Sequence, residues 1–303
     1  MSYGPLWGLI SGGVMLVGGG NLIVVAVLFK LVLMAAWCGC LWCVDKICET
    51  TAPGRRALCV AVLGWAPAGV GQALAEGHND VVMVAFILLW LAMLTHRRRE
   101  APIALVASVL CKYVSLPLAA VELVVLLRSG TDLRRTVLRV LAPTVVGLAV
   151  MAFFFRSLSF FDGLLIINDW HFLRLRDAIR GLEGLIGLPL SYVGIAVSLV
   201  FPIFAARQFL IAYRDSSLEN LIALAIAVMA AVLFGFIAHV WPWYLIWGLG
   251  LAALDPAWWI SRFIIGVSIA SPFTLASWWI AGMEDQRDLV SLGTYAFAVL
   301  WTA

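Results

Sequence analysis

The sequence predicts an all-α, polytopic protein embedded in a membrane. Hydrophobic residues make up 64% of its 303 residues, charged residues only 12%, and the mean hydropathy is +1.04. Such a chain has too little polar surface to cover the exterior of an ordinary soluble domain. Its apolar stretches are uniformly Leu, Ala, Val and Ile, without the alternation of barrel strands, so we expect helices.

Apolar segments long enough to cross or enter a bilayer follow one another along the whole chain. The candidates are 21–44, 57–75, 80–95, 101–127, 137–155, 187–212, 220–238, 243–254, 257–281 and 289–303. We therefore expect one transmembrane domain, residues 1–303, with about nine to eleven membrane segments and no soluble domain. No basic residue precedes the first apolar segment, so no cleaved signal peptide is expected.

The chain has six cysteines, and three of them, Cys38, Cys40 and Cys43, lie close together. At about 100° per residue these three point in different directions on a helix, so they cannot form a metal face. We expect these cysteines to act as small apolar side chains near the cytoplasmic side and to form no metal site. The sequence leaves open whether the protein requires a metal ion.

A polar pentad, Glu76-Gly77-His78-Asn79-Asp80, lies between two of the apolar segments. A charge in a bilayer costs roughly 2.5 to 3.5 kcal/mol on insertion scales, so these side chains need partners or a wet cavity. The pentad therefore predicts the rim of an active site.

Lysines and arginines in short loops mark the cytoplasmic side of a membrane protein. Basic residues gather at Arg55-Arg56, at 96–99 and at 128–139. If the first two groups are inside, segments 57–75 and 80–95 form a hairpin. Its tip, the pentad, then faces the extracytoplasmic side.

The same rule places both ends of 101–127 inside, so this segment should enter the membrane and return as two half-helices. Lys112-Tyr113 lies midway, and Pro102 and Pro117 interrupt helical bonding around it. We expect Lys112 at the tip. A single tilted span with a snorkelling lysine is the alternative.

The outer loop 156–186 carries arginines against the positive-inside rule. Within it, apolar residues recur at helical spacing on one face: Phe172, Leu175, Ile179, Leu182 and Ile186. We expect an amphipathic helix in the outer interface. Arg174 and Arg176 could hold phosphate bidentately, or could simply be the wet face of that helix.

An aromatic cluster, Trp241-Pro242-Trp243-Tyr244, follows the segment 220–238. Such a cluster is typical of a membrane interface. His239 adds a titratable group just before it, on the same predicted side as the pentad.

In order, these motifs resemble a known pattern: Tyr3-Gly4-Pro5-Leu6, Gly71-Gln72 before the Gly77 to Asp80 motif, Lys112-Tyr113 with Pro117, and 241–244. The pattern is similar to that of the polyprenyl-phosphate-mannose-dependent mannosyltransferases of the GT-C superfamily. The resemblance spans most of the chain, although each motif is short. It implies a GT-C-like fold with short or re-entrant helices and an interfacial amphipathic helix.

The resemblance implies an inverting glycosyltransferase of the bacterial cytoplasmic (inner) membrane, with its active site on the extracytoplasmic side. Mannose or a similar sugar would move from a polyprenyl-phosphate donor to a glycolipid or glycan acceptor. The lipid bilayer and these two substrates are the expected partners. Neither a bound cofactor nor a nucleic acid is expected.

In members of that family a carboxylate in an early outer loop removes the proton of the acceptor hydroxyl. Residues 1–20 contain no Asp or Glu, because the chain begins two residues before the Tyr-Gly-Pro-Leu element. Either the start is assigned late, or the protein is an inactive or partnered relative, or another acid acts. Asp80 is the preferred candidate, followed by Glu76 and Asp169; Asp80 could instead cap the next helix and Glu76 could be a solvated loop acid.

The remaining site residues are expected to hold the donor phosphate and sugar or to orient the acceptor. They are His78, Asn79, Lys112, Tyr113, Arg174, Arg176 and His239. The histidines could instead be satisfied by backbone partners. Tyr3 and Pro5 are expected to shape a loop.

Two other classes of function stay open. A secondary transporter or flippase of a lipid-linked or anionic substrate would also use broken helices and charges within the membrane. A catalytically inactive partner subunit would account for the missing acidic loop. Direct transfer to a labelled acceptor separates the first class from an enzyme.

Overall fold

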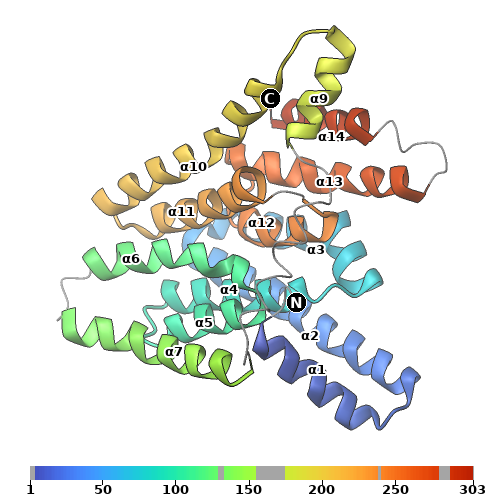
Figure 1. Ribbon diagram of the computed structural model, residues 1–303. Helices are drawn as coiled ribbons and strands as arrows, with labels where there is room; N and C mark the ends of the chain where they lie inside the picture. Colours follow the sequence, from blue (N-terminus) through green and yellow to red (C-terminus); the bar gives the residue numbers. More distant parts are fainter. Residues whose placement is uncertain (1–3, 129–132, 155–174, 238–239, 280–286, 303) are drawn as a thin grey trace.

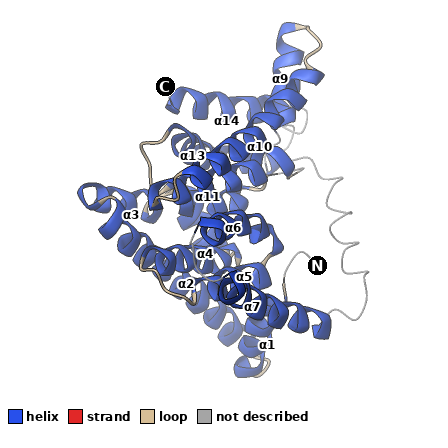
Figure 2. Ribbon diagram, turned by 90° about the vertical axis from the view of Figure 1, so that its left-hand side faces the viewer, coloured by secondary structure: helices blue, strands red, loops and turns tan. Residues whose placement is uncertain are grey.

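The computed structural model describes residues 4–128, 133–154, 175–237, 240–279 and 287–302, and these ranges are built from helices joined by loops (Figure 2). The predicted all-α fold is therefore confirmed. The α-helices are α1 Pro5–Gly18, α2 Leu22–Thr51, α3 Arg56–Gly64, α4 Asp80–Thr95, α5 Ala101–Cys111, α6 Ala119–Arg128, α7 Leu133–Phe154, α9 Leu175–Ile186, α10 Ser191–Arg214, α11 Leu218–Ala230, α12 Leu245–Ala252, α13 Trp259–Trp279 and α14 Arg287–Thr302. Short 3₁₀ or π turns connect them: η1 Pro53–Arg55, η2 Gly69–Glu76, η3 Tyr113–Leu118, η6 Ala231–Phe236 and η7 Pro242–Tyr244.

Three described helices are long and apolar enough to cross a membrane: Leu22–Thr51, Tyr192–Arg214 and Leu218–Phe236. A bent pair, Pro53–Gly64 with Gly69–Glu76, would make a fourth span. Several apolar segments counted in the sequence are shorter helices, because breaks such as the one at Lys112 divide them. Large apolar side chains on the outer helices are exposed, among them Leu16 at 83% and Leu300 at 76%, as expected where lipid replaces water.

Helix α4 lies at the centre of the fold and packs against α2, α5 and α12 (Figure 1). Its apolar side chains are buried on all sides, including Val81, Ile87, Leu88 and Leu91. A helix that is hydrophobic all round belongs in such a core. Its first residue, Asp80, is the last residue of the predicted pentad, so the core helix carries the candidate site at its N-terminus.

The N-terminal element forms a helix, which corrects the expectation that Pro5 shapes a loop. Pro5 is the first residue of α1, a position where proline's missing N–H costs nothing. Before it, the Gly4 N–H donates to the carbonyl of Cys111 at 2.8 Å. A Cβ on Gly4 would lie 2.1 Å from the carbonyl oxygen of Leu110, so only glycine permits this approach. Tyr3 lies outside the described residues.

The segment 101–127 turns back on itself, as the re-entrant interpretation predicts. Helix α5 ends at Cys111, Lys112 is extended with φ −159° and ψ 124°, and η3 and α6 follow. Lys112 contacts Asp80 at the start of α4, whereas Glu122 of α6 accepts a hydrogen bond from Trp90, far along α4. Thus α6 runs parallel to α4 and returns to the end where α5 began. The alternative of a single tilted span is wrong.

The basic groups used for orientation gather at the C-terminal end of α4, opposite the pentad. His96 follows α4 directly, and Arg128 at the end of α6 donates to the carbonyl of Arg214 at 3.4 Å. Arg55 pairs at 3.2 Å with Asp255, which follows α12. The charge separation that the positive-inside rule uses is therefore present along the axis of α4.

The predicted amphipathic helix is present as α9, which packs against α14 and α10 (Figure 1). Small residues make the close contact: Ala178 is buried, and a Cβ on Gly181 would lie 2.6 Å from the carbonyl oxygen of Asp288. Ile186, at the end of the predicted stripe, is 48% exposed. Ala178 and Gly181 thus lie on the face of α9 that packs most closely against its neighbours.

Candidate active site

The pentad forms the turn between η2 and α4. Gly77 has φ +89°, in the left-handed region that glycine adopts without strain, and it ends the π-helical turn η2. The His78 N–H then donates to the carbonyl of Gln72 at 3.0 Å. This tight return places the side chains of Glu76 and His78 beside each other.

Both carboxylate oxygens of Glu76 are oriented by hydrogen bonds. Nε2 of Gln72 donates to Oε1 at 3.0 Å, and Nε2 of His78 lies 3.3 Å from Oε2. The Glu76 side chain is nevertheless 48% exposed, while Gln72 beneath it is only 4% exposed. Glu76 is therefore a positioned carboxylate that a substrate can reach.

The His78 ring is held by the aromatic cluster that follows η6. It stacks on Trp243 with ring centroids 4.1 Å apart and an interplanar angle of 11°. Trp243 stacks in turn on Trp241 at 4.7 Å. These contacts place the aromatic cluster beside the pentad; His239, which was expected on the same side, lies outside the described residues.

Burial lowers the pKa of His78 below its ordinary value of 6.5, and the nearby Asp80 and Glu76 oppose that shift. The imidazole is therefore neutral near pH 7 and has one N–H to donate. Because a carboxylate oxygen only accepts, Nε2 carries that hydrogen in the bond to Glu76. His78 thus holds and orients Glu76 without adding a charge.

Asp80, the preferred base in the sequence, is completely buried. Its Oδ1 accepts from Nζ of Lys112 at 2.6 Å and from Nε1 of Trp247. Its Oδ2 is buried without a hydrogen-bond partner among the described residues. The alternative of a helix cap is wrong, because Asn79 holds the N-cap position and the Asp80 carboxylate bonds to other elements.

Lys112 lies where α5 breaks, and its side chain is 8% exposed. Besides Asp80, its ammonium lies over the rings of Tyr244 at 4.5 Å and Trp247 at 4.7 Å. These contacts join α4, α12 and the re-entrant tip through one buried charge pair. They give Lys112 a structural partner, and its role toward phosphate stays a prediction.

The other predicted site residues are brought together only in part. Asn79 lies in the pentad turn, and its side chain makes no cap to α4. Tyr113 begins η3 directly after Lys112. Arg174, Asp169 and His239 lie outside the described residues, and Arg176 lies in the first turn of α9, where its side chain is not described.

The sequence reasoning missed one charged residue, Lys30 of α2. Its Nζ donates to the carbonyls of Leu74 and Ala75 at 2.7 and 2.6 Å, directly before Glu76. The signal was available, because Lys30 is the first charged residue of the chain and stands alone in a long apolar run. A lone ionisable residue in a membrane helix is a functional candidate by default.

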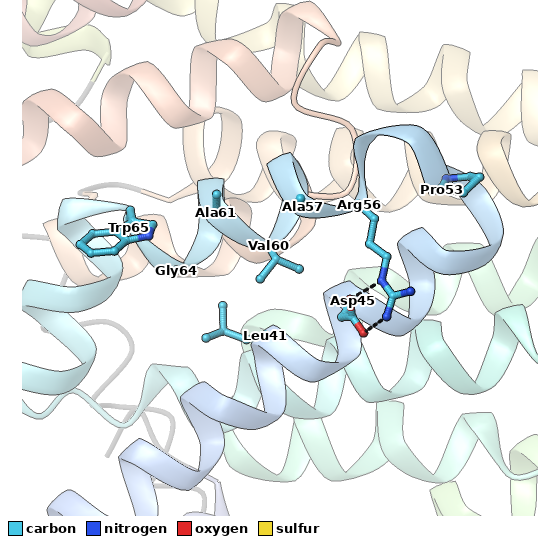
Figure 3. Close-up of a pocket in the computed structure, with 9 residues that line it drawn as sticks. All are labelled: Leu41, Asp45, Pro53, Arg56, Ala57, Val60, Ala61, Gly64 and Trp65. Carbon is cyan, nitrogen blue, oxygen red and sulfur yellow. Dashed lines mark hydrogen bonds and ion pairs between the residues drawn. The ribbon is translucent and has the colours of Figure 1, made fainter.

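A separate cavity of about 800 Å³ lies between α2 and α3 (Figure 3). Figure 3 shows the Arg56 guanidinium facing the Asp45 carboxylate at one end, Trp65 at the other, and small or apolar side chains between them. Its lining residues are Leu41, Asp45, Pro53, Arg56, Ala57, Val60, Ala61, Gly64 and Trp65. None of the predicted site residues lines it.

The described residues do not bring three or more His, Cys, Asp or Glu side chains together at a metal-binding geometry. All six cysteines are described, and all are free thiols.

Comparison with known proteins gives a family model that matches the N-terminal part of the chain. Residues 1–131 match the family model of the alpha-(1->6)-mannopyranosyltransferase N-terminal domain. The match covers α1 to α6 and so includes Lys30, the pentad and Lys112. No curated protein and no solved structure matched the chain. The enzyme class expected from the sequence, a glycosyltransferase, is supported by the family model, and mannose is the sugar that this model names.

Proposed function

We propose that the protein transfers a mannosyl residue from a polyprenyl-phosphate donor to a hydroxyl group of an extracytoplasmic glycan or glycolipid, with Glu76 as the general base. One observation carries this proposal. Glu76 is an exposed carboxylate whose two oxygens are oriented by Gln72 and His78, at the polar end of an otherwise apolar core helix.

The transfer is a single displacement. The acceptor oxygen forms a bond to the anomeric carbon of mannose while the bond from that carbon to the phosphate oxygen breaks. The hydroxyl proton passes to Glu76, and the lipid leaves as polyprenyl phosphate. Attack from the face opposite the leaving group inverts the anomeric centre. A base within about 3 Å of the hydroxyl contributes roughly 10² to 10⁴-fold to such a step.

The neighbouring side chains supply position. His78 fixes one carboxylate oxygen and is itself clamped on Trp243. The stacked Trp243 and Trp241 rings present flat apolar surfaces beside the carboxylate. Aromatic and apolar walls with a few oriented polar groups are the usual lining of small-molecule sites.

Asp80 is not the proposed base, although the sequence favoured it narrowly. A general base must come within hydrogen-bond reach of the proton that it removes. Asp80 is fully buried, and its Oδ1 is occupied by Lys112 and Trp247. We assign it the role of a positioning residue that joins the start of α4 to the re-entrant tip.

The extracytoplasmic location is supported by the separation of charge along α4. The pentad lies at the N-terminal end of this helix, and basic residues gather at its C-terminal end. Under the positive-inside rule the basic end is cytoplasmic. A donor on the opposite side is then a lipid-linked sugar, because nucleotide sugars are cytoplasmic.

The test uses the purified full chain in lipid nanodiscs, polyprenyl-phosphate mannose labelled in the sugar, and a glycolipid extract as acceptor. Glu76→Gln should lower the rate of label transfer by about 100-fold or more. Glu100→Gln, an acid at the other end of α4, is the matched control and should transfer at the wild-type rate. Transfer by Glu76→Gln at the wild-type rate, or equal use of GDP-mannose, would overturn the proposal.

A further inference from the structure

Lys30 places an ammonium group against the backbone that leads into the proposed base. Its Nζ bonds to the carbonyls of Leu74 and Ala75, the two residues that precede Glu76. A Cβ on Gly77 would lie 3.4 Å from this Nζ, so the lysine also reaches the turn that follows Glu76. The positive charge of Lys30 therefore lies against the turn that precedes α4.

This charge has no anionic partner among the described residues. No carboxylate oxygen of the described part of the chain lies within 4.0 Å of Nζ of Lys30. An ammonium carries three donors, and the two carbonyls take two of them. The side chain is half-buried, and the third donor has no hydrogen-bond partner among the described residues.

Among the described residues, the other lysine near the pentad is already engaged. Lys112 is buried against Asp80 at the start of α4. A donor phosphate at Glu76 therefore needs a different positive charge. Lys30 is the described lysine that lies next to Glu76.

The surface around Lys30 suits a lipid with a charged head. Val27 and Met34 lie one turn before and one turn after it on the same face of α2, and they are 52% and 50% exposed. Ile23, a further turn away, is 76% exposed. An apolar stripe thus leads along the outside of α2 to the ammonium.

We propose that Lys30 binds the phosphate of the lipid-linked donor, with the prenyl chain lying along the Ile23, Val27 and Met34 stripe. This assignment rests on the proposed function. The phosphodiester of the donor carries one negative charge, and the phosphate monoester that leaves carries nearly two. An ammonium at that oxygen therefore stabilises the leaving group more than the bound donor, which is how a charge accelerates a reaction.

The test measures binding without transfer. The probe is polyprenyl phosphate without a sugar, added to the full chain in detergent, and the readout is the ligand-dependent rise in the unfolding temperature. Lys30→Gln should weaken this binding by about tenfold or more, as expected for loss of a hydrogen bond to a charged group. Lys30→Arg should retain most of the affinity. Lys46→Gln, on the same helix but paired with Glu49, should bind as the wild type does.

A second ligand separates phosphate recognition from damage to η2, whose carbonyls Lys30 also caps. Neutral polyprenol has the same chain and no phosphate, so Lys30→Gln should leave its binding unchanged. Equal weakening toward both ligands, or unchanged binding of polyprenyl phosphate, would overturn the assignment. Both binding measurements are made without catalysis. A negative result would overturn only the role of Lys30, whereas transfer by Glu76→Gln at the wild-type rate would overturn the role of Glu76 as the base.

Discussion

The buried pair Lys112–Asp80 joins the re-entrant tip to the start of α4, and a single residue change can test it. Its carboxylate is fully buried and its ammonium is 8% exposed, so removal of either charge leaves a buried charge without its ion-pair partner. Pairs of this kind contribute little to net stability relative to apolar replacements, yet breaking one is costly.

We expect Lys112→Met to lower the free energy of unfolding by about 3 to 5 kcal/mol. The double variant Lys112→Met, Asp80→Asn should recover much of this loss, because the amide keeps an acceptor for Trp247 and carries no charge. Chemical unfolding in detergent measures both. As a control, Arg55→Gln breaks an exposed pair with Asp255 and should cost at most about 1 kcal/mol. Unfolding of Lys112→Met at the wild-type midpoint would contradict this view of the pair.

The pH response of His78 is a second prediction at this scale. Burial lowers its pKa in the folded state below the ordinary value of 6.5, so protons bind more readily to the unfolded chain. The contribution of neutral His78 to stability is therefore fully present above pH 6.5, and it is lost as the pH falls through the lowered pKa of the folded state. Between pH 7 and pH 5 the unfolding temperature of the wild type should fall more than that of His78→Gln. Parallel curves for the two proteins would show that this histidine is not the group responsible.

At the scale of elements, the contact between the N-terminus and the re-entrant tip decides where Lys112 sits. Gly4 bonds to the carbonyl of Cys111, one residue before Lys112, and its own carbonyl accepts from Gly8 at the start of α1. The first helix therefore holds the tip of the α5–α6 hairpin in place through backbone contacts that only a glycine allows.

Gly4→Ala tests this contact with a matched control on the same helix. The backbone φ of −81° suits alanine, so the expected loss of stability comes from the Cβ, which would lie 2.1 Å from the carbonyl oxygen of Leu110. We expect a fall in unfolding temperature and in sugar transfer. Gly12→Ala meets nothing within 4 Å and should instead stabilise α1 by up to about 1 kcal/mol. Equal behaviour of the two variants would argue against a role for the contact.

At the scale of the whole molecule, the fold has a polar end and a basic end joined by α4. Both ends of the α5–α6 hairpin lie at the basic end, whereas the pentad lies at the other. This arrangement predicts which side of a membrane each loop can be reached from.

A cysteine-labelling experiment in sealed vesicles measures that arrangement. With the exposed Cys38 replaced by serine, Glu100→Cys and Arg128→Cys should react with an impermeant maleimide from the same side. Ala75→Cys, beside the site, should react from the opposite side. Labelling of Glu100→Cys and Arg128→Cys from opposite sides would mean that the segment 101–127 crosses the membrane.

Much of this architecture follows from local patterns of residue type. Uniform apolar runs predict buried or lipid-facing helices, the basic loops predict orientation, and Lys112 between two prolines predicts the break in α5. The first helix was missed, since its glycine-rich sequence lacks the length of a span. Periodicity within α9 predicted its existence but not that Ala178 and Gly181 make its closest contact, which depends on α14.

The sequence by itself determined the helical membrane fold, the re-entrant segment and the polar pentad, because hydropathy and helix-breaking residues act over a few neighbouring positions. Only the tertiary structure decided which carboxylate is buried and which is open. Asp80 and Glu76 are four residues apart in the same polar run, yet Lys112 and Trp247 enclose the first while Gln72 and His78 orient the second. Gln72 and His78 are close to Glu76 in the sequence, but Lys112 and Trp247 come from distant segments. No local pattern could therefore show that Asp80 is enclosed, or that Lys30 lies against the residues before Glu76.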